Sequence, residues 1–173
     1  HTQPHQQRPP APYPPRVRTD DADSPHPPQN IELEITETTL MTDARRMVRL
    51  LDELRAMGVH LSIDDFGTGY SSLAALQQFP VGTLKIDRSF VRHATVSRDD
   101  AALVRTIVEM GRNLNLEVLA EGIETVEQLA FLRGLGCHYG QGRLFGEPMT
   151  AEELLALMLD QARGERRYAT LFG

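Results

Sequence analysis

Apolar and polar residues follow two different spacings from Ile31 onward, and the alternation between them predicts βα units. Short apolar runs are followed by stretches in which apolar residues recur three or four positions apart, which is the spacing of one helix face. Strands that alternate with such helices are typical of a parallel sheet. We therefore predict an α/β fold. The predicted strands span residues 31–35, 60–65, 83–87, 117–121 and 139–145, the last being a glycine-rich strand and loop, and the predicted helices span residues 43–57, 73–78, 101–114, 125–134 and 151–163.

The ends of these helices carry residues that start or stop a helix. Gly58, Gly134 and Gly136 are expected to close helices, because glycine adopts the left-handed conformation that often follows the last turn. Pro80 should stop the short helix before it, and the hydroxyl of Thr125 suits a first turn. We place residues 98–100 in a polar loop and expect the Leu and Met stripes of the helices to form the core.

The first 29 residues differ from the rest. They contain nine of the 11 prolines and no Leu, Ile, Phe or Met, so they cannot bury enough apolar surface to order themselves. We divide the chain into a disordered Pro-rich segment (residues 1–29), a folded domain (30–163) and a C-terminal tail (164–173). The Pro-Pro pairs leave open a second interpretation, a polyproline ligand for an aromatic groove.

The net charge, the cysteine count and the length of the apolar runs exclude several classes of protein. The formal net charge of -6 argues against binding to a DNA or RNA polymer. A single cysteine, Cys137, excludes an internal disulfide and a Cys-based zinc site, and we interpret it as a small buried side chain rather than a reactive thiol. We find no apolar run long enough to form a membrane segment, and we expect a cytoplasmic localisation.

The side chains that could bind a metal or take part in catalysis follow the carboxyl ends of the predicted strands. Parallel sheets form their binding and active sites at these ends. Adjacent carboxylates repel each other and are costly to desolvate, so Asp64 and Asp65 favour a bound cation. Carboxylates are ligands for Mg²⁺ or Mn²⁺, and two such metals are a common solution for phosphodiester hydrolysis. The ionisable and amide groups at the strand ends are Glu34, Glu37, Asp64, Asp65, Lys85, Asp87, Glu121, Glu124 and Gln141.

Each of these groups also has a structural interpretation. Asp64 and Asp65 could belong to a solvated turn. The acid pairs at 34 and 37 and at 121 and 124 could be first-turn acids of the helices that follow them. Lys85 could be a solvent-facing strand residue. The residues alone leave these alternatives open.

Five motifs in order resemble the EAL domain family, which comprises bacterial cyclic-di-GMP phosphodiesterases that act in second-messenger signalling. The resemblance covers residues 28 to about 162 of this chain. The motifs are Glu34-Ile-Thr-Glu37, Asp64-Asp65-Phe-Gly-Thr-Gly-Tyr-Ser-Ser-Leu73, Leu84-Lys85-Ile-Asp87, Ala120-Glu121-Gly-Ile-Glu124-Thr and Gln141-Gly-Arg-Leu-Phe145.

The resemblance implies a TIM-like (β/α) barrel that hydrolyses cyclic di-GMP to linear pGpG with Mg²⁺ or Mn²⁺ in a two-metal site. It also implies a homodimer formed through the loop after Asp65. The roles implied for this chain are metal binding for Glu34, Asp64 and Asp65, catalysis for Glu121, Lys85 and Asp65, and substrate or loop positioning for Glu37, Glu124 and Gln141.

The chain departs from the family pattern near its start. It contains neither the Glu-Ala-Leu motif nor the Asn-bearing strand that follows it, both of which supply metal ligands in the family. We therefore expect roughly the last five βα units of a barrel that needs about 250 residues, and a truncated chain that is weak or inactive alone. The alternative is a catalytically degenerate module that binds cyclic di-GMP or a protein partner.

Overall fold

Five parallel strands form one sheet in the order β1-β2-β3-β4-β5 in the computed structural model, which describes residues 27–69 and 73–162. Each strand pairs with the next one along the chain, as expected for consecutive βα units. The strands are β1 (Glu32–Thr36), β2 (His60–Phe66), β3 (Thr83–Ile86), β4 (Glu117–Ala120) and β5 (Tyr139–Gly140). The helices are η1 (Pro28–Asn30), a 3-10 helix, and α1 (Glu37–Thr42), α2 (Ala44–Ala56), α3 (Leu73–Leu76), α4 (Arg88–His93), α5 (Arg98–Asn113), α6 (Val126–Leu135) and α7 (Ala151–Ala162).

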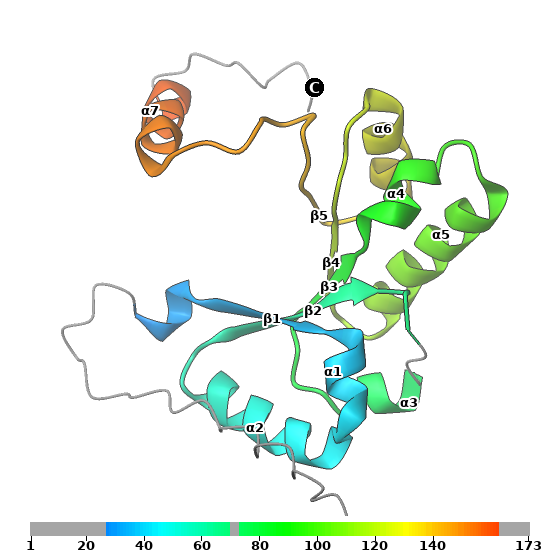
Figure 1. Cartoon of the computed structure of the whole chain (residues 1–173), viewed down its shortest axis with the longest axis vertical. Coiled ribbons are helices and arrows are strands. Elements are labelled where there is room, and N and C mark those ends of the chain that lie inside the picture. Colours follow the sequence, from blue (N-terminus) through cyan, green and yellow to red (C-terminus); the bar gives the residue numbers. More distant parts are fainter. Residues whose placement is uncertain (1–26, 70–72, 163–173) are drawn as a thin grey trace, which may run out of the picture.

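The hydrophobic core lies between the sheet and its helices. Figure 1 shows α2, α5 and α6 around the outside of a curved sheet, with α7 standing apart. Successive residues of a strand point to opposite faces, so Leu84 and Ile86 of β3 contribute to this core while Lys85 between them faces the other side of the sheet. Apolar side chains of the strands are therefore buried under the helices that cover the outside of the sheet. The opposite face of the sheet is left for polar groups.

The structure confirms most of the predicted elements. The first four predicted strands agree with β1 to β4 to within one residue at each end. The fifth strand is shorter than predicted, because the chain turns after Gly140 and the N–H of Phe145 bonds to the carbonyl of Gly142. The described residues begin at Pro27, so residues 1–26 of the predicted disordered segment and the whole of the predicted tail lie outside them.

Three short helices, η1, α1 and α4, were not predicted, and one helix starts earlier than predicted. α1 and α4 have six residues each, too few to show a helical repeat. Residues 98–100 are not a loop but the first turn of α5, because Ser97 accepts a hydrogen bond from the N–H of Asp100. Asp99 and Asp100 then lie at the positive end of the helix dipole.

The helix caps agree with the predictions, with one change. Thr125 precedes α6 and forms a capping box with Gln128, while Gly136, at φ 77°, ends the helix. Gly134 lies inside α6 rather than closing it. Gly58 follows α2 with φ 95°.

The prediction that all Leu and Met stripes are core is wrong for α7. Its Leu155 and Met158 are 58% and 59% exposed, and Leu154 and Leu159 are also exposed. The helix is present as predicted, but these four side chains are exposed rather than part of the core.

Candidate active site

Three carboxylates from different parts of the sheet meet at one ammonium group. The Nζ atom of Lys85 lies 2.5 Å from Oε1 of Glu34, 3.2 Å from Oδ1 of Asp64 and 2.7 Å from Oε1 of Glu121. The Lys85 side chain is only 5% exposed, whereas that of Glu34 is 50% exposed. The structure thus brings together four of the predicted site residues.

The surrounding carboxylates stabilise the positive charge of Lys85. Burial alone would lower the pKa of Lys85, but the hydrogen bonds with Glu121 and Glu34 outweigh burial and raise it above the ordinary value. The interpretation of Lys85 as a solvent-facing strand residue is therefore wrong, since its side chain points into the carboxylate cluster.

The end of β2 is irregular where the two aspartates stand. The pairing with β3 shifts register between Ile63 and Phe66, and Asp65 has a positive φ of 52°. Bulges and left-handed residues of this kind re-aim side chains and are common beside functional sites. Oδ1 of Asp64 is buried and, although it is in ion-pair range of Lys85, it accepts no hydrogen bond from the described residues.

Asp65 lies beside Asp87, a strand-end carboxylate to which the sequence assigned no role. Desolvation and the nearby charges of Asp64 and Asp87 raise the pKa of Asp65. Asp87 accepts hydrogen bonds from the backbone N–H and the hydroxyl of Ser89, and these outweigh its own desolvation and lower its pKa. The opposite shifts mark Asp65 and Asp87 as an interacting carboxyl pair, whose protons belong to the pair rather than to one residue. The signal in the sequence is that Asp87 follows Lys85 by two positions, on the same side of the strand.

Glu37 binds the backbone of the loop that follows Asp64 and Asp65. Its side chain is buried, and Oε2 accepts hydrogen bonds from the N–H groups of Gly67 at 3.0 Å and Gly69 at 3.1 Å. A Cβ atom on Gly69 would lie 2.9 Å from the Glu37 carboxyl group, so the loop approaches this closely only with glycine. Glu37 is also the first residue of α1, a helix that was not predicted, whereas the structural interpretation placed it ahead of the helix that starts near Asp43.

We predict that Glu37→Ala lowers the free energy of unfolding by about 2–3 kcal/mol, because two backbone donors lose a charged acceptor. Urea denaturation measures the difference. Glu37→Gln keeps an acceptor oxygen and should lose clearly less. A Glu37→Ala protein as stable as the parent would show that the loop finds other acceptors.

Glu124 and Gln141 lie outside the Lys85 cluster. Glu124 is exposed and lines a separate pocket of about 300 Å³ beside α4, together with Arg88 and Arg92. Gln141 is held through its backbone, whose N–H donates to Ala120 and whose carbonyl accepts from Ile123. Their positioning roles therefore stay predictions.

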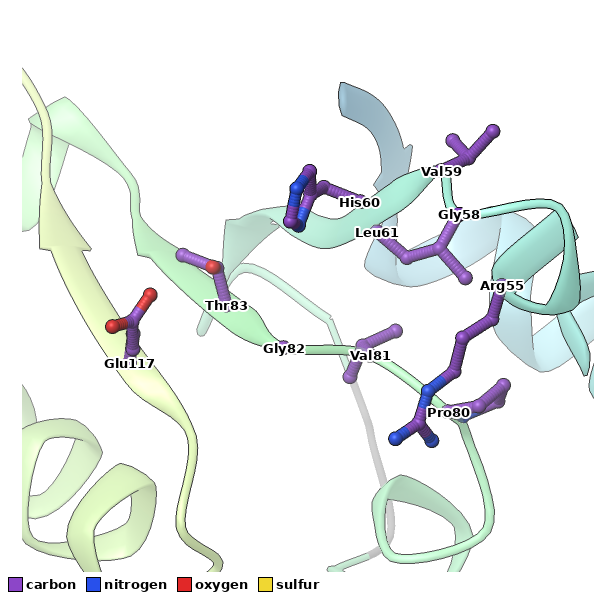
Figure 2. A pocket seen from close by; sticks show the side chains of 10 residues that line it. All are labelled: Arg55, Gly58, Val59, His60, Leu61, Pro80, Val81, Gly82, Thr83 and Glu117. Atoms are coloured by element: carbon purple, nitrogen blue, oxygen red, sulfur yellow. The ribbon is translucent and has the colours of Figure 1, made fainter. Parts of the chain in front are cut away.

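A second pocket lies at the opposite end of the strands. It has a volume of about 310 Å³, and Figure 2 shows Arg55 and Glu117 at its two ends with His60 and Thr83 between them. Glu117 accepts a hydrogen bond from the hydroxyl of Tyr139. This end brings no second carboxylate to the pocket lining, so the candidate site stays at the carboxyl ends.

The atoms around Lys85 are of the chemical type that a hard divalent cation binds. They are carboxylate oxygens, and one of them, Oδ1 of Asp64, is buried without a hydrogen bond. Within residues 27–69 and 73–162, however, no three His, Cys, Asp or Glu side chains are arranged, as they stand, so that they could hold a metal ion.

Comparison with protein-family models matches residues 15–148 to the EAL domain. The chain belongs to the EAL domain family. Among curated relatives, it is 54% identical to the bifunctional diguanylate cyclase/cyclic di-GMP phosphodiesterase MucR of Pseudomonas aeruginosa over 129 residues, which are 75% of this chain and 19% of MucR. The chain thus spans about a fifth of that relative's length.

Solved structures of EAL domains share the fold. The phosphodiesterase part of Pseudomonas aeruginosa MucR in complex with c-di-GMP is 52% identical, with a TM-score of 0.72 over 74% of this chain and 52% of that one. A manganese/cy-diGMP complex of Klebsiella pneumoniae BlrP1 is 37% identical, with a TM-score of 0.65 over 70% of this chain and 31% of that one. The EAL fold of this chain is accordingly a TIM-like (β/α) barrel, represented by five parallel strands.

Two further predictions, on membrane segments and on Cys137, can be compared with the structure. None of the described helices is both long and apolar enough to cross a membrane. Cys137 is half-buried, and burial raises the pKa of its thiol to about 11, which agrees with a structural rather than a reactive cysteine. The loop proposed for dimerisation is described only as far as Gly69, so the homodimer stays a prediction, as do the cytoplasmic localisation and the exclusion of nucleic-acid polymers.

Proposed function

We propose that this chain hydrolyses cyclic di-GMP to linear pGpG with a divalent metal, Mg²⁺ or Mn²⁺, at the site around Lys85. The observation that supports this most is the convergence of Glu34, Asp64 and Glu121 on one buried cation. The names of the relatives point the same way, since MucR is described as a cyclic di-GMP phosphodiesterase and BlrP1 was solved with manganese and cy-diGMP.

Three residues would hold the metal in this proposal: Glu34, Asp64 and Asp65. They stand at the ends of neighbouring strands β1 and β2, and Asp64 already has a buried oxygen without a hydrogen bond. A divalent metal in such a site polarises the phosphoryl oxygens and acidifies water for in-line attack.

The remaining steps fall to the side chains of the chain itself. Glu121 accepts the proton of the attacking water, because it is a half-buried carboxylate whose Oε1 lies 2.7 Å from Nζ of Lys85. Lys85 orients that water or a phosphate oxygen, since its ammonium carries three donors. Glu37 keeps the Gly67–Gly69 backbone over the site.

We propose that turnover by the 173-residue chain alone is slow. The described acids are not, as they stand, arranged to hold a metal ion, so the ligands must rearrange before the chemistry can begin. This rearrangement reduces the population of the competent state.

A second candidate function is binding of cyclic di-GMP without cleavage. The position of Lys85 at the centre of the carboxylates favours it, because an ammonium group there balances the acids without any metal. A domain of this kind would act as a receptor for the dinucleotide or as an interaction module.

The test is to incubate the purified chain with cyclic di-GMP and Mn²⁺ or Mg²⁺ and to separate the products by chromatography. We expect slow, metal-dependent formation of pGpG, and a loss of about 10²-fold or more for Glu121→Gln, the size of a general-base contribution. Arg105→Ala, at an exposed position on α5, is the matched control and should leave the rate unchanged.

Calorimetry with the same ligand separates the two candidate functions. Saturable binding with no product supports the receptor and contradicts the phosphodiesterase. A chain that neither binds nor cleaves cyclic di-GMP contradicts both functions.

A further inference from the structure

Lys85 is the only lysine among the 18 Lys and Arg residues of the chain. The other 17 are arginines, whose planar guanidinium presents a fixed fork of donors, whereas the lysine ammonium is a compact point charge. The one compact ammonium group is buried, 4% exposed, and contacts carboxylates that come from β1, β2 and the end of β4. It is therefore the residue that holds these strand ends together electrostatically.

One ammonium charge offsets only part of the negative charge that surrounds it. Three carboxylates contact Lys85, and the Asp65 and Asp87 pair adds further negative charge beside them. A site with this excess attracts a second, more highly charged cation. The oxygens that such a cation needs are those already in contact with Lys85.

A divalent cation bound to these oxygens would lie close to the ammonium and be repelled by it. A hard divalent cation requires direct oxygen contacts of about 2.0–2.6 Å, and Nζ already stands 2.5 Å and 2.7 Å from the oxygens of Glu34 and Glu121. As they stand, the acids of residues 27–69 and 73–162 form no group of three that could hold a metal ion.

We propose that Lys85 and a divalent cation exchange at this site: cation binding displaces the ammonium from the carboxylates, and Lys85 thereby sets the metal affinity of the chain. The displaced ammonium is then available to a phosphate of the substrate. This inference rests on the metal-binding part of the proposed function and needs no substrate for its test.

The first experiment observes the ammonium directly in the unaltered chain. Because there is one lysine, the ¹⁵N-labelled protein has one lysine side-chain NH₃⁺ resonance, which is visible while the group is buried and paired. Titration with diamagnetic Mg²⁺ or Ca²⁺ should shift this signal, or broaden it through exchange with water, in step with cation binding measured by calorimetry.

The second experiment compares variants for Mn²⁺ affinity by calorimetry. We expect Lys85→Met to bind Mn²⁺ roughly tenfold more tightly or better, because the competing cation is gone. Lys85→Arg keeps the charge and should not gain affinity. Arg105→Met removes an exposed cation from α5 and should leave the affinity unchanged.

Broadening of the ammonium signal through exchange with water distinguishes displacement from a field effect, which would only shift it. If the ammonium resonance stays unchanged while the unaltered chain binds the cation, the exchange is wrong, whatever Lys85→Met does. Equal or weaker Mn²⁺ binding by a folded Lys85→Met chain, or no binding to either protein, also overturns it. Failure to cleave cyclic di-GMP would contradict the proposed function but leave this result intact.

Discussion

Replacement of Gly142 by alanine should destabilise the protein by about 3 kcal/mol, the upper end of the range for overpacking. A Cβ atom at this position would lie 2.1 Å from the carbonyl oxygen of Ile123 and 2.3 Å from its nitrogen. These are backbone atoms, so no side-chain rotation relieves the clash. The turn that carries Gln141 would have to leave the end of β4, where the Gln141 N–H bonds to Ala120.

Gly134 supplies the matched control for this prediction. It lies inside α6, and a Cβ atom there meets nothing within 4 Å. Gly134→Ala should therefore stabilise the protein by about 0.5–1 kcal/mol through helix propensity. Urea denaturation of both variants provides the comparison. Equal stability of the two would show that the turn does not pack against Ile123 in solution.

Lys85→Met should lower the free energy of unfolding by about 2–3 kcal/mol in metal-free buffer. Removal of one partner of a buried ion pair leaves uncompensated charge, here on three carboxylates. We place the effect below that of a fully buried pair because Glu34 is half exposed and water screens its charge. Denaturation in urea measures the loss, and Arg105→Met should change stability by no more than about 0.5 kcal/mol.

The pH dependence of this difference has a defined sign. The pKa of Lys85 is higher in the folded than in the unfolded state, so its contribution is fully present below the unfolded value of 10.5. Above that pH the unfolded lysine loses its proton first, and the advantage over Lys85→Met should shrink as pH rises toward the folded pKa. A gap that persists unchanged in strong alkali would mean that packing, not charge, explains the loss.

The strands and the acids at their ends could be predicted because both depend on local pattern. Segments 60–65 and 83–87 have the length of strands and alternate apolar with polar residues, and parallel strands place their carboxyl ends at one edge. The short helices α1 and α4 could not be predicted, since six residues show no helical period. The start of α5 was misjudged because Arg98, Asp99 and Asp100 have loop composition but helical positions.

The exposed face of α7 shows a different limit. Its leucines repeat at helical spacing, and spacing predicts which face is apolar but not what covers it. Burial is a property of two surfaces, and a single helix sequence describes only one of them.

By itself, the sequence determined the βα order, the membership of Glu34, Asp64, Lys85 and Glu121 in one edge of a sheet, and the resemblance to EAL domains. Only the tertiary structure decided that Lys85 stands at the centre of the carboxylates, that Asp87 pairs with Asp65, and that Glu124 and Gln141 lie apart from them. Distances between strands depend on register, on the bulge in β2 and on the left-handed turn at Asp65, and none of these follows from local pattern.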